Sequence, residues 1–256
     1  MLQKSRRVPI MKSRSKFSAL PYTAWVILFT VIPFILVIYY AFTSKSTGAF
    51  SLENISNASK YFPILIRSVY LALIATVICL VIAYPFAYLM SKSNKSTQRV
   101  FLLLIMLPMW MNFLLRTYAW MTLLDDNGLI NQFLTSLGLP QMKLINTQSS
   151  VVLGMVYNYL PFMILPIYNV LCKIDPNVIN AAKDLGANNF KTFIKVTLPL
   201  SVPGIISGIT MVFVPALTTF IISNLLGGSK ILLIGNVIEQ EFLQANNWHL
   251  GSGLSM

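Results

Sequence analysis

Five long apolar runs, separated by short polar gaps, constrain this chain more than any other feature of its sequence. They cover residues 19–42, 61–90, 100–124, 149–172 and 196–226. At a rise of about 1.5 Å per residue, a helix of such length crosses the roughly 30 Å hydrocarbon core of a bilayer. Because a helix satisfies its own backbone hydrogen bonds in lipid, each run is predicted to be a transmembrane helix. We therefore expect an all-α integral membrane protein.

The composition supports a lipid environment. Only 10% of the 256 residues are charged, whereas 56% are hydrophobic, and a soluble protein could not cover its surface with so few charges. The formal net charge of +12 does not indicate nucleic acid, because the basic residues occupy short gaps and not one basic face. Cys79 and Cys172 lie in apolar runs without a CxxC pair, so we expect both to be small buried hydrophobes.

The distribution of Lys and Arg predicts the orientation. Residues 1–18 carry six basic residues, and the apolar run that follows is too long for a signal peptide. If the N-terminus is cytoplasmic, thirteen of the nineteen Lys and Arg residues fall on the cytoplasmic side. We therefore expect 1–18 to be a basic cytoplasmic tail, followed by a retained first span.

This topology places two short apolar segments outside. Residues 129–137 follow a turn at 125–128 and are predicted to form an amphipathic segment on the outer face. Residues 231–242 are too short to span and are expected to be re-entrant or interfacial. Small residues follow at 251–253, and such residues are common at the start of a membrane helix that packs closely against others.

The longest cytoplasmic connection, residues 173–195, has helical signals of its own. Asp175 is a predicted N-cap and Pro176 a first helical residue, so a short helix should run to a turn at Gly186. A second short helix then leads into the fifth span, carrying Phe190, Phe193, Ile194 and Lys195. Ile179, Ala182 and Leu185 share one face of the first helix. Periodicity alone leaves two alternatives open, a helix resting on the inner leaflet and a helix that docks a partner.

The order of residues in this connection resembles the EAA loop of ABC-importer permeases. That motif reads Glu-Ala-Ala, three residues, Gly, nine residues, Ile, one residue and Leu-Pro. The matching positions here are Asn180, Ala181, Ala182, Gly186, Val196, Leu198 and Pro199. Asn180 replaces the Glu and so removes a carboxylate, whereas Val196 conservatively replaces Ile. The resemblance implies that residues 173–199, including Asp184, form a loop that docks onto a separate ATPase.

Further stretches are similar to the B-type permeases of spermidine and putrescine importers, which are of the binding-protein-dependent, MetI-like type. They are Tyr84-Pro85-Phe86-Ala87-Tyr88, Pro108-Met109-Trp110 with Arg116, Leu160-Pro161-Phe162, Ala181–Gly186, Leu226-Gly227-Gly228 and Leu233-Ile234-Gly235-Asn236. The resemblance covers nearly the whole chain from the first span onward. It implies a type I ABC-importer permease bundle in a bacterial cell membrane, forming half of a pore for polyamines or, alternatively, for another small solute. Because that family has six spans, we expect the last one to be missing from this sequence.

The same resemblance implies the partners. They are a dimer of ATPase subunits, a second permease and an extracytoplasmic solute-binding protein. This chain has no GxxxxGK[ST] phosphate loop, so we expect it to hold no cofactor and ATP to be bound and hydrolysed by a separate chain. It has one histidine, His249, and no metal-ligand cluster, so neither a metal site nor a catalytic residue is predicted. A secondary transporter or channel is disfavoured, because no Asp or Glu lies within an apolar run.

A polyamine path would need acidic and aromatic side chains. Carboxylates at the outer mouth would attract a polycation, and aromatic faces would hold its ammonium groups. The mouth candidates are Asp125, Asp126, Glu239 and Glu241, and the wall candidates are Trp110, Tyr118, Trp120, Tyr157 and Tyr159. The acids alternatively belong to solvated loops or contact the binding protein, and the aromatics alternatively form an interfacial belt or pack between helices.

Arg116 lies well inside the third apolar run. A buried arginine in lipid is unfavourable unless it pairs or snorkels, so it is predicted either to pair across a permease dimer as a gate or to snorkel. Asn112, Arg116 and Trp120 share one helical face at a spacing of four residues. Asn158, close to Pro161, is predicted to line the pore or to bond a neighbouring helix.

Overall fold

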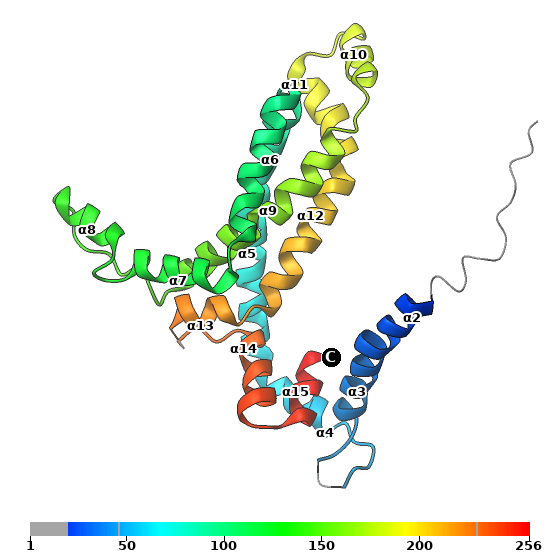
Figure 1. Cartoon of the computed structure of the whole chain (residues 1–256), viewed down its shortest axis with the longest axis vertical. Helices are drawn as coiled ribbons and strands as arrows, with labels where there is room; N and C mark the ends of the chain where they lie inside the picture. The colour runs from blue at the N-terminus through cyan, green and yellow to red at the C-terminus, as the bar shows by residue number, and fades with distance from the viewer. Residues whose placement is uncertain (1–19, 46, 229) are drawn as a thin grey trace, which may run out of the picture. The chain divides into compact units, whose positions relative to one another are not determined.

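The computed structural model describes residues 20–45, 47–228 and 230–256 (Figure 1). Within these ranges the chain forms helices joined by turns, with one isolated antiparallel bridge between Thr43 and Phe50. The chain divides into two compact units, Met1–Ser59 with Ala245–Met256, and Lys60–Gln244. The predicted all-α fold class is confirmed, whereas the predicted basic tail at 1–18 lies outside the described residues.

The smaller unit contains the first apolar run. Helices α2 (Leu20–Val26) and α3 (Ile32–Ala41) are joined by a π-helical turn at Ile27–Val31 into one continuous helix long enough to span a bilayer. Most of its side chains are exposed, as expected for a helix whose solvent is lipid. Helices α4 (Glu53–Ala58) and α15 (Trp248–Ser255) pack at its C-terminal end.

Asn54 holds this small unit together. Its side-chain amide donates to the carbonyl oxygens of Tyr40, Ala41 and Thr43 at 3.3, 3.2 and 2.8 Å. These carbonyls lie at or just after the C-terminal end of α3, where the backbone acceptors of a helix run out of intrahelical donors. Gly253 of α15 lies directly against the Asn54 backbone, where a Cβ would be a tight 3.1 Å from the Asn54 carbonyl group. The small residues at 251–253 are thus used for close helix packing.

The larger unit contains the other helices. They are α5 (Phe62–Lys92), α6 (Lys95–Trp110), α7 (Phe113–Leu124), α8 (Leu129–Ser136), α9 (Gln148–Leu171), α10 (Pro176–Asp184), α11 (Asn189–Thr192), α12 (Leu198–Thr218), α13 (Ile221–Gly227) and α14 (Ile234–Glu239). A short turn at Ser59–Tyr61 precedes α5, and π-helical turns occupy Phe193–Thr197 and Gln240–Gln244. Helix α8 is the short amphipathic helix predicted after the third span.

Helices α5, α9 and α12 form the centre of this unit. One face of α5 presents small residues at helical spacing, all of them buried: Ser68, Ala72, Ala75, Thr76, Cys79, Ala83 and Ala87. Gly208 of α12 meets α9 so closely that a Cβ there would lie 2.7 Å from the Met163 sulfur. Small side chains let membrane helices approach closely and gain van der Waals contact, which drives packing in lipid.

Helices α5 and α9 run in the same direction. Leu71 and Gln148, near their N-terminal ends, line one cavity, while Lys92 and Leu171, at their C-terminal ends, line another. The chain must therefore return once between Lys95 and Gln148. Helix α6 and the stretch Phe113–Ser136, which contains α7 and α8, lie in this part of the chain and meet at an angle of 89°.

The third apolar run is therefore divided between two helices, and its prediction as one helix over 100–124 is wrong. Pro108 lacks a backbone donor near the end of α6, which weakens the last helical turn. Asn112 then starts a new helix, because its Oδ1 accepts from the backbone N–H of Leu114 at 2.8 Å. The fifth run is interrupted in a similar way, since α12 ends at Thr218 and α13 begins at Ile221.

The first part of the segment at 231–242, up to Val237, is mostly buried inside the larger unit. Leu233 is fully buried, and the backbone N–H of Ile234 donates to the Ser68 hydroxyl at 2.8 Å. Asn236 accepts from the Ser223 hydroxyl at 2.6 Å and from the Leu233 N–H at 2.9 Å. These contacts join the segment to α5 and α13, and both predicted alternatives, a re-entrant and an interfacial segment, stay predictions.

The two cysteines differ from each other. Cys79 is buried and its thiol points to the Val156 carbonyl at 3.8 Å, as predicted for a small hydrophobe. Cys172 is exposed, so the prediction for it is wrong. Helix α9 ends at Leu171, one residue earlier than the apolar run suggested, and Cys172 belongs to the following turn.

Candidate functional site

The loop between α9 and α12 begins with helix α10, which has both ends capped. Asp175 Oδ1 accepts from the N–H of Asn177 at 2.9 Å, and Pro176 is the first helical residue. At the other end Gly186 has a φ of +83°. The N–H groups of Gly186 and of the next residue donate back to the last turn at 2.8 and 3.0 Å, which is a Schellman cap. The first residue of α10 and the turn at Gly186 lie at the positions predicted from the sequence.

The second half of the loop differs from the prediction. Asn188 caps α11 by accepting from the N–H of Lys191 at 2.8 Å. Helix α11, the π-helical turn at Phe193–Thr197 and α12 then form one continuous helix, Asn189–Thr218, so the second short helix is not separate. The π-helical turn precedes Pro199 and provides the wider backbone spacing that its ring requires.

The base of the loop is fixed to α5. The Phe193 ring packs edge-on against Tyr84 and Tyr88, with centroid distances of 5.8 and 5.4 Å. The Tyr84 hydroxyl lies 2.9 Å from that of Ser201, the first buried residue of α12. The base of the loop is therefore in contact with two helices of the central bundle, α5 and α12.

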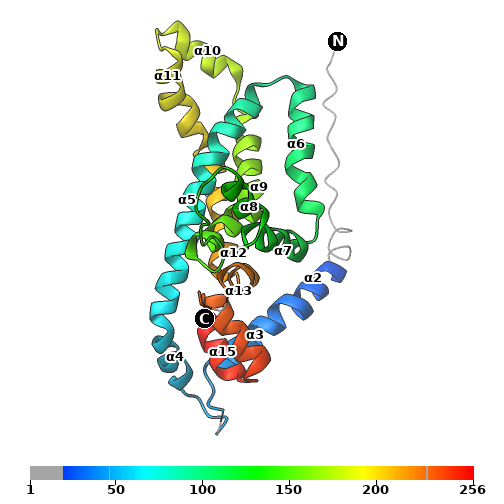
Figure 2. The same ribbon diagram turned by 90° about the vertical axis from the view of Figure 1, so that its left-hand side faces the viewer.

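The head of the loop, by contrast, presents apolar side chains to solvent. Leu185 is 89% exposed, Phe190 70% and Val178 45%. Ile179 and Ala182 are half-buried, so the predicted common face of Ile179, Ala182 and Leu185 is divided between the bundle and the solvent. Figures 1 and 2 both show α10 and α11 beyond the ends of α5 and α9, at one end of the unit. Exposed apolar residues at such a place are typical of an interaction surface.

The residues predicted to form the loop that docks onto the ATPase occupy three different places. Ala181, Asp184 and Gly186 are exposed on the head, whereas Leu198 and Pro199 lie in the first turn of α12. Asn180 is also exposed on α10, and it lines a pocket with a cavity volume of about 350 Å³.

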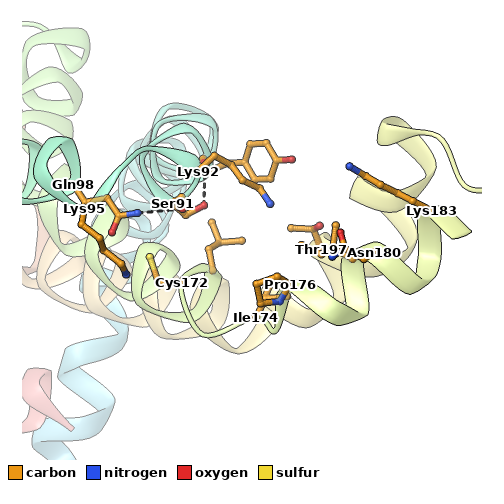
Figure 3. Close-up of a pocket in the computed structure, with 13 residues that line it drawn as sticks. Ser91, Lys92, Lys95, Gln98, Cys172, Ile174, Pro176, Asn180, Lys183 and Thr197 are labelled. Carbon is orange, nitrogen blue, oxygen red and sulfur yellow. Dashed lines mark hydrogen bonds between the residues drawn. The ribbon is translucent and has the colours of Figure 1, made fainter.

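This pocket lies between the ends of α5 and α9, the start of α6 and the inner face of α10. Lys92, Lys95 and Lys183 approach it from three helices (Figure 3). Its floor is fixed by Gln98, which accepts from the Tyr168 hydroxyl at 3.1 Å and donates to the Ser93 carbonyl at 2.9 Å. Sequence reasoning missed the pocket, because its lysines come from distant parts of the chain. The excess of lysines in the gaps predicted to be cytoplasmic was the only signal.

Arg116 is buried in the larger unit, with 7% of its surface exposed. Its Nε and Nη1 have no hydrogen-bond partner, and its guanidinium lies 5.9 Å from the Phe113 ring centroid. This burial argues against snorkelling, which would bring the guanidinium to the surface. Asn112 caps α7 and is not a helical residue, so the predicted shared face of Asn112, Arg116 and Trp120 is incomplete.

Two of the predicted wall residues meet. The rings of Trp120 and Tyr157 lie 5.3 Å apart and join α7 to α9. Next to Tyr157, Asn158 is buried. Its amide donates to the Gly154 carbonyl at 2.9 Å, while its Oδ1 has no partner. The remaining wall candidates do not join this pair: Trp110 and Tyr118 are exposed, and the Tyr159 hydroxyl donates to the Pro215 carbonyl at 3.3 Å.

The four predicted mouth acids do not form one cluster. Asp125 and Asp126 are exposed in the turn between α7 and α8, while Glu239 and Glu241 lie at the end of α14 and in the turn after it. Figure 1 shows α8 and α14 in different parts of the unit.

The chain is similar to known transport proteins. Residues 10–249 match the family described as binding-protein-dependent transport system inner membrane component. The chain is 41% identical over 242 residues to the spermidine/putrescine transport system permease protein PotB of Haemophilus influenzae, covering 91% of this chain and 85% of the relative. It is 38% identical over 241 residues to PotB of Escherichia coli K12, covering 91% and 88%.

The fold is shared with a solved bacterial ABC transporter involved in the import of the acidic polysaccharide alginate. The TM-score is 0.72 at 18% identity, covering 94% of this chain and 88% of the other. The predicted permease bundle is thus confirmed. The EAA-like loop, the central bundle and the match over residues 10–249 agree, and the chain belongs to the family of binding-protein-dependent transport system inner membrane components, as a permease subunit of an ABC importer.

Proposed function

We propose that this permease forms half of the pore of an importer for the polyamines spermidine and putrescine. The single observation that supports this solute is the 41% identity to a spermidine/putrescine permease over most of the chain. A permease for another small solute is the alternative. It is favoured by the permease YdcU of Escherichia coli K12, which is 34% identical over 217 residues and has no solute in its name.

The exposed head of the loop is the proposed contact with the ATPases. Leu185 and Phe190 would enter an apolar groove of an ATPase dimer, which binds and hydrolyses ATP. Closure of that dimer would push the head, and the Phe193 contact would pass the movement to α5 and α12. The pore would then alternate between outward and inward access.

The remaining partners follow from this function. A second permease completes the pore, and an extracytoplasmic binding protein delivers the solute. A solved alginate ABC transporter with a similar fold forms a complex with a periplasmic protein, which supports the second partner. The N-terminus is proposed to be cytoplasmic, because this orientation places most Lys and Arg residues on the cytoplasmic side of the bacterial membrane.

The solute path is proposed to begin at the acids and continue along aromatic rings. Asp125, Asp126, Glu239 and Glu241 would raise the local concentration of a polycation at the outer mouth. The joined rings of Trp120 and Tyr157 would offer π-faces to its ammonium groups.

Uptake of radiolabelled spermidine tests the proposal. The gene is expressed with its neighbouring transporter genes in a bacterial strain that lacks its own polyamine importers. Uptake that depends on ATP, and that unlabelled putrescine competes away, is the expected result. A transporter that assembles with an ATPase but takes up neither polyamine would contradict the solute and leave the permease assignment intact.

A further inference from the structure

The lysine-lined pocket behind the loop has no carboxylate among its lining residues. Lys92, Lys95 and Lys183 contribute three positive charges, and the other polar groups are neutral. The ammonium group of Lys92 lies 5.7 Å from the Tyr88 ring centroid, a contact that does not neutralise its charge. Three like charges around one cavity repel each other, so the pocket favours an anion.

Asn180 contributes to the excess of positive charge in the pocket. It stands where the EAA-like pattern has a Glu, and its side chain lines the pocket with that of Lys183 (Figure 3). A carboxylate at this position would place a negative charge among the lysines of the same chain. The amide of Asn180 leaves the pocket positive and can itself donate a hydrogen bond to an anion.

Part of the lining of the pocket is apolar. Leu171, Ile174 and Ile179 line it, and Lys95 begins a helix whose side chains at Leu103 and Leu107 are exposed as expected for contact with lipid. A free inorganic anion would gain nothing from the apolar part. An amphiphile would use both parts of the lining, because its charged headgroup would meet the lysines and its glycerol and acyl parts the apolar residues.

We propose that this pocket binds the phosphate headgroup of an anionic phospholipid such as phosphatidylglycerol. The phosphate oxygens accept from the ammonium groups of Lys92, Lys95 and Lys183 and from the Asn180 amide. The bound lipid then fills the space between the inner face of α10 and the bundle and supports the loop from behind. Which leaflet holds this lipid depends on the proposed orientation of the chain. Binding of the lipid in detergent does not depend on it.

Native mass spectrometry of the detergent-purified transporter tests the proposal. The delipidated protein is titrated separately with phosphatidylglycerol, phosphatidylcholine and inorganic phosphate. The wild type is expected to retain phosphatidylglycerol in preference to phosphatidylcholine. At roughly fivefold per lysine, the double variant Lys92→Gln/Lys183→Gln should weaken this binding about 25-fold. Asn180→Glu, which keeps all three lysines, should weaken it as well.

The matched control is Lys191→Gln/Lys195→Gln. It removes the same charge from exposed residues of the same loop that do not line the pocket, and it should retain phosphatidylglycerol like the wild type. An equal loss in this control would show general surface attraction and overturn the proposal. Binding of inorganic phosphate without a preference for phosphatidylglycerol would assign the pocket to free phosphate and also overturn it.

One further variant tests the lipid proposal and the proposed ATPase contact independently of each other. Gly186→Ala alters the head of the loop but not the pocket, so it should impair recovery of the ATPase while phosphatidylglycerol binding persists. If Gly186→Ala removes both, the lipid reports only on assembly of the transporter, and the pocket is not its site.

Discussion

The rings of Phe193 and Tyr84 meet edge-on with their centroids 5.8 Å apart, and this contact ties the base of the loop to α5. The head of the same loop differs, since Leu185 and Phe190 are exposed. Burial at the base and exposure at the head suit a lever, because the head can bind a partner while the base moves the bundle.

Replacement of Phe193 by Ala should separate ATPase docking from transport. Loss of a half-buried ring should destabilise the permease by about 2 kcal/mol and leave α10 without its link to α5. We expect the ATPase to co-purify at near wild-type levels while spermidine uptake falls several-fold. Uptake in vesicles and the ATPase recovered by affinity purification measure the two effects.

Phe190→Ala is the matched control, since Phe190 is 70% exposed on the head. It should leave the thermal stability of the permease unchanged but reduce recovery of the ATPase. If Phe190→Ala and Phe193→Ala behave alike in both measurements, the loop does not act as a lever.

Gly186→Ala should weaken ATPase docking through the backbone alone. A Cβ on Gly186 would meet no atom within 4 Å, but its φ of +83° is unfavourable for any L-residue by about 1–2 kcal/mol. The strain loosens the cap of α10 and shifts Leu185, so the fraction of ATPase that co-purifies should fall.

Gly138 offers a closely matched control at the end of α8. Its φ is +77°, and a Cβ there would also meet no atom within 4 Å. Gly138→Ala should cause similar local strain without affecting ATPase recovery. A similar loss of ATPase in both variants would mean that general destabilisation, and not the geometry of the loop, explains the effect.

Much of the fold was predictable from the sequence, because lipid requires long apolar helices and because caps have local signals. Asp175, Pro176 and Gly186 fix the ends of α10 through contacts within a few residues. The breaks near Asn112 and Thr218 were not predictable from hydropathy, because both sides of each break are equally apolar. Prolines gave no guidance either, since Pro85 and Pro161 lie inside continuous helices.

The candidate site was predictable only where it is local. The residues of the EAA-like pattern all lie within the short stretch 180–199, and the loop they form is recognisable from their spacing. The contact of Phe193 with Tyr84 and the pocket around Lys92 and Lys183 depend on helices distant in sequence. Both depend on how the small-residue face of α5 packs. The periodicity of the sequence reveals this face but does not show which helix packs against it.

Asn112→Ala should destabilise α7 by about 1 kcal/mol. Its Oδ1 accepts from the N–H groups of Leu114 and Leu115 at 2.8 and 3.4 Å, and an alanine would leave these donors without a partner. Asn112→Asp should retain most of the stability, because a carboxylate also caps a helix and favours its N-terminus. Thermal unfolding in detergent measures both. Equal loss in the two variants would contradict the capping role.

Arg116→Met should affect stability and transport in opposite directions. Nε and Nη1 of Arg116 are buried without acceptors, and each such donor costs about 1–3 kcal/mol. An apolar side chain of similar length removes this penalty, so the isolated permease should unfold at a higher temperature. If Arg116 pairs with a group of the second permease, as the gating proposal requires, the same variant should lower spermidine uptake in the assembled transporter.

Arg67→Met provides the control, because Arg67 is an exposed arginine on α5. It removes the same charge and should change neither the unfolding temperature nor uptake. Arg116→Lys distinguishes charge from geometry, since lysine keeps the charge but lacks the planar set of donors that pairs with a carboxylate. Partial uptake by Arg116→Lys would support a charge pair across the interface. Unchanged uptake by Arg116→Met would instead show that the buried arginine has no part in gating.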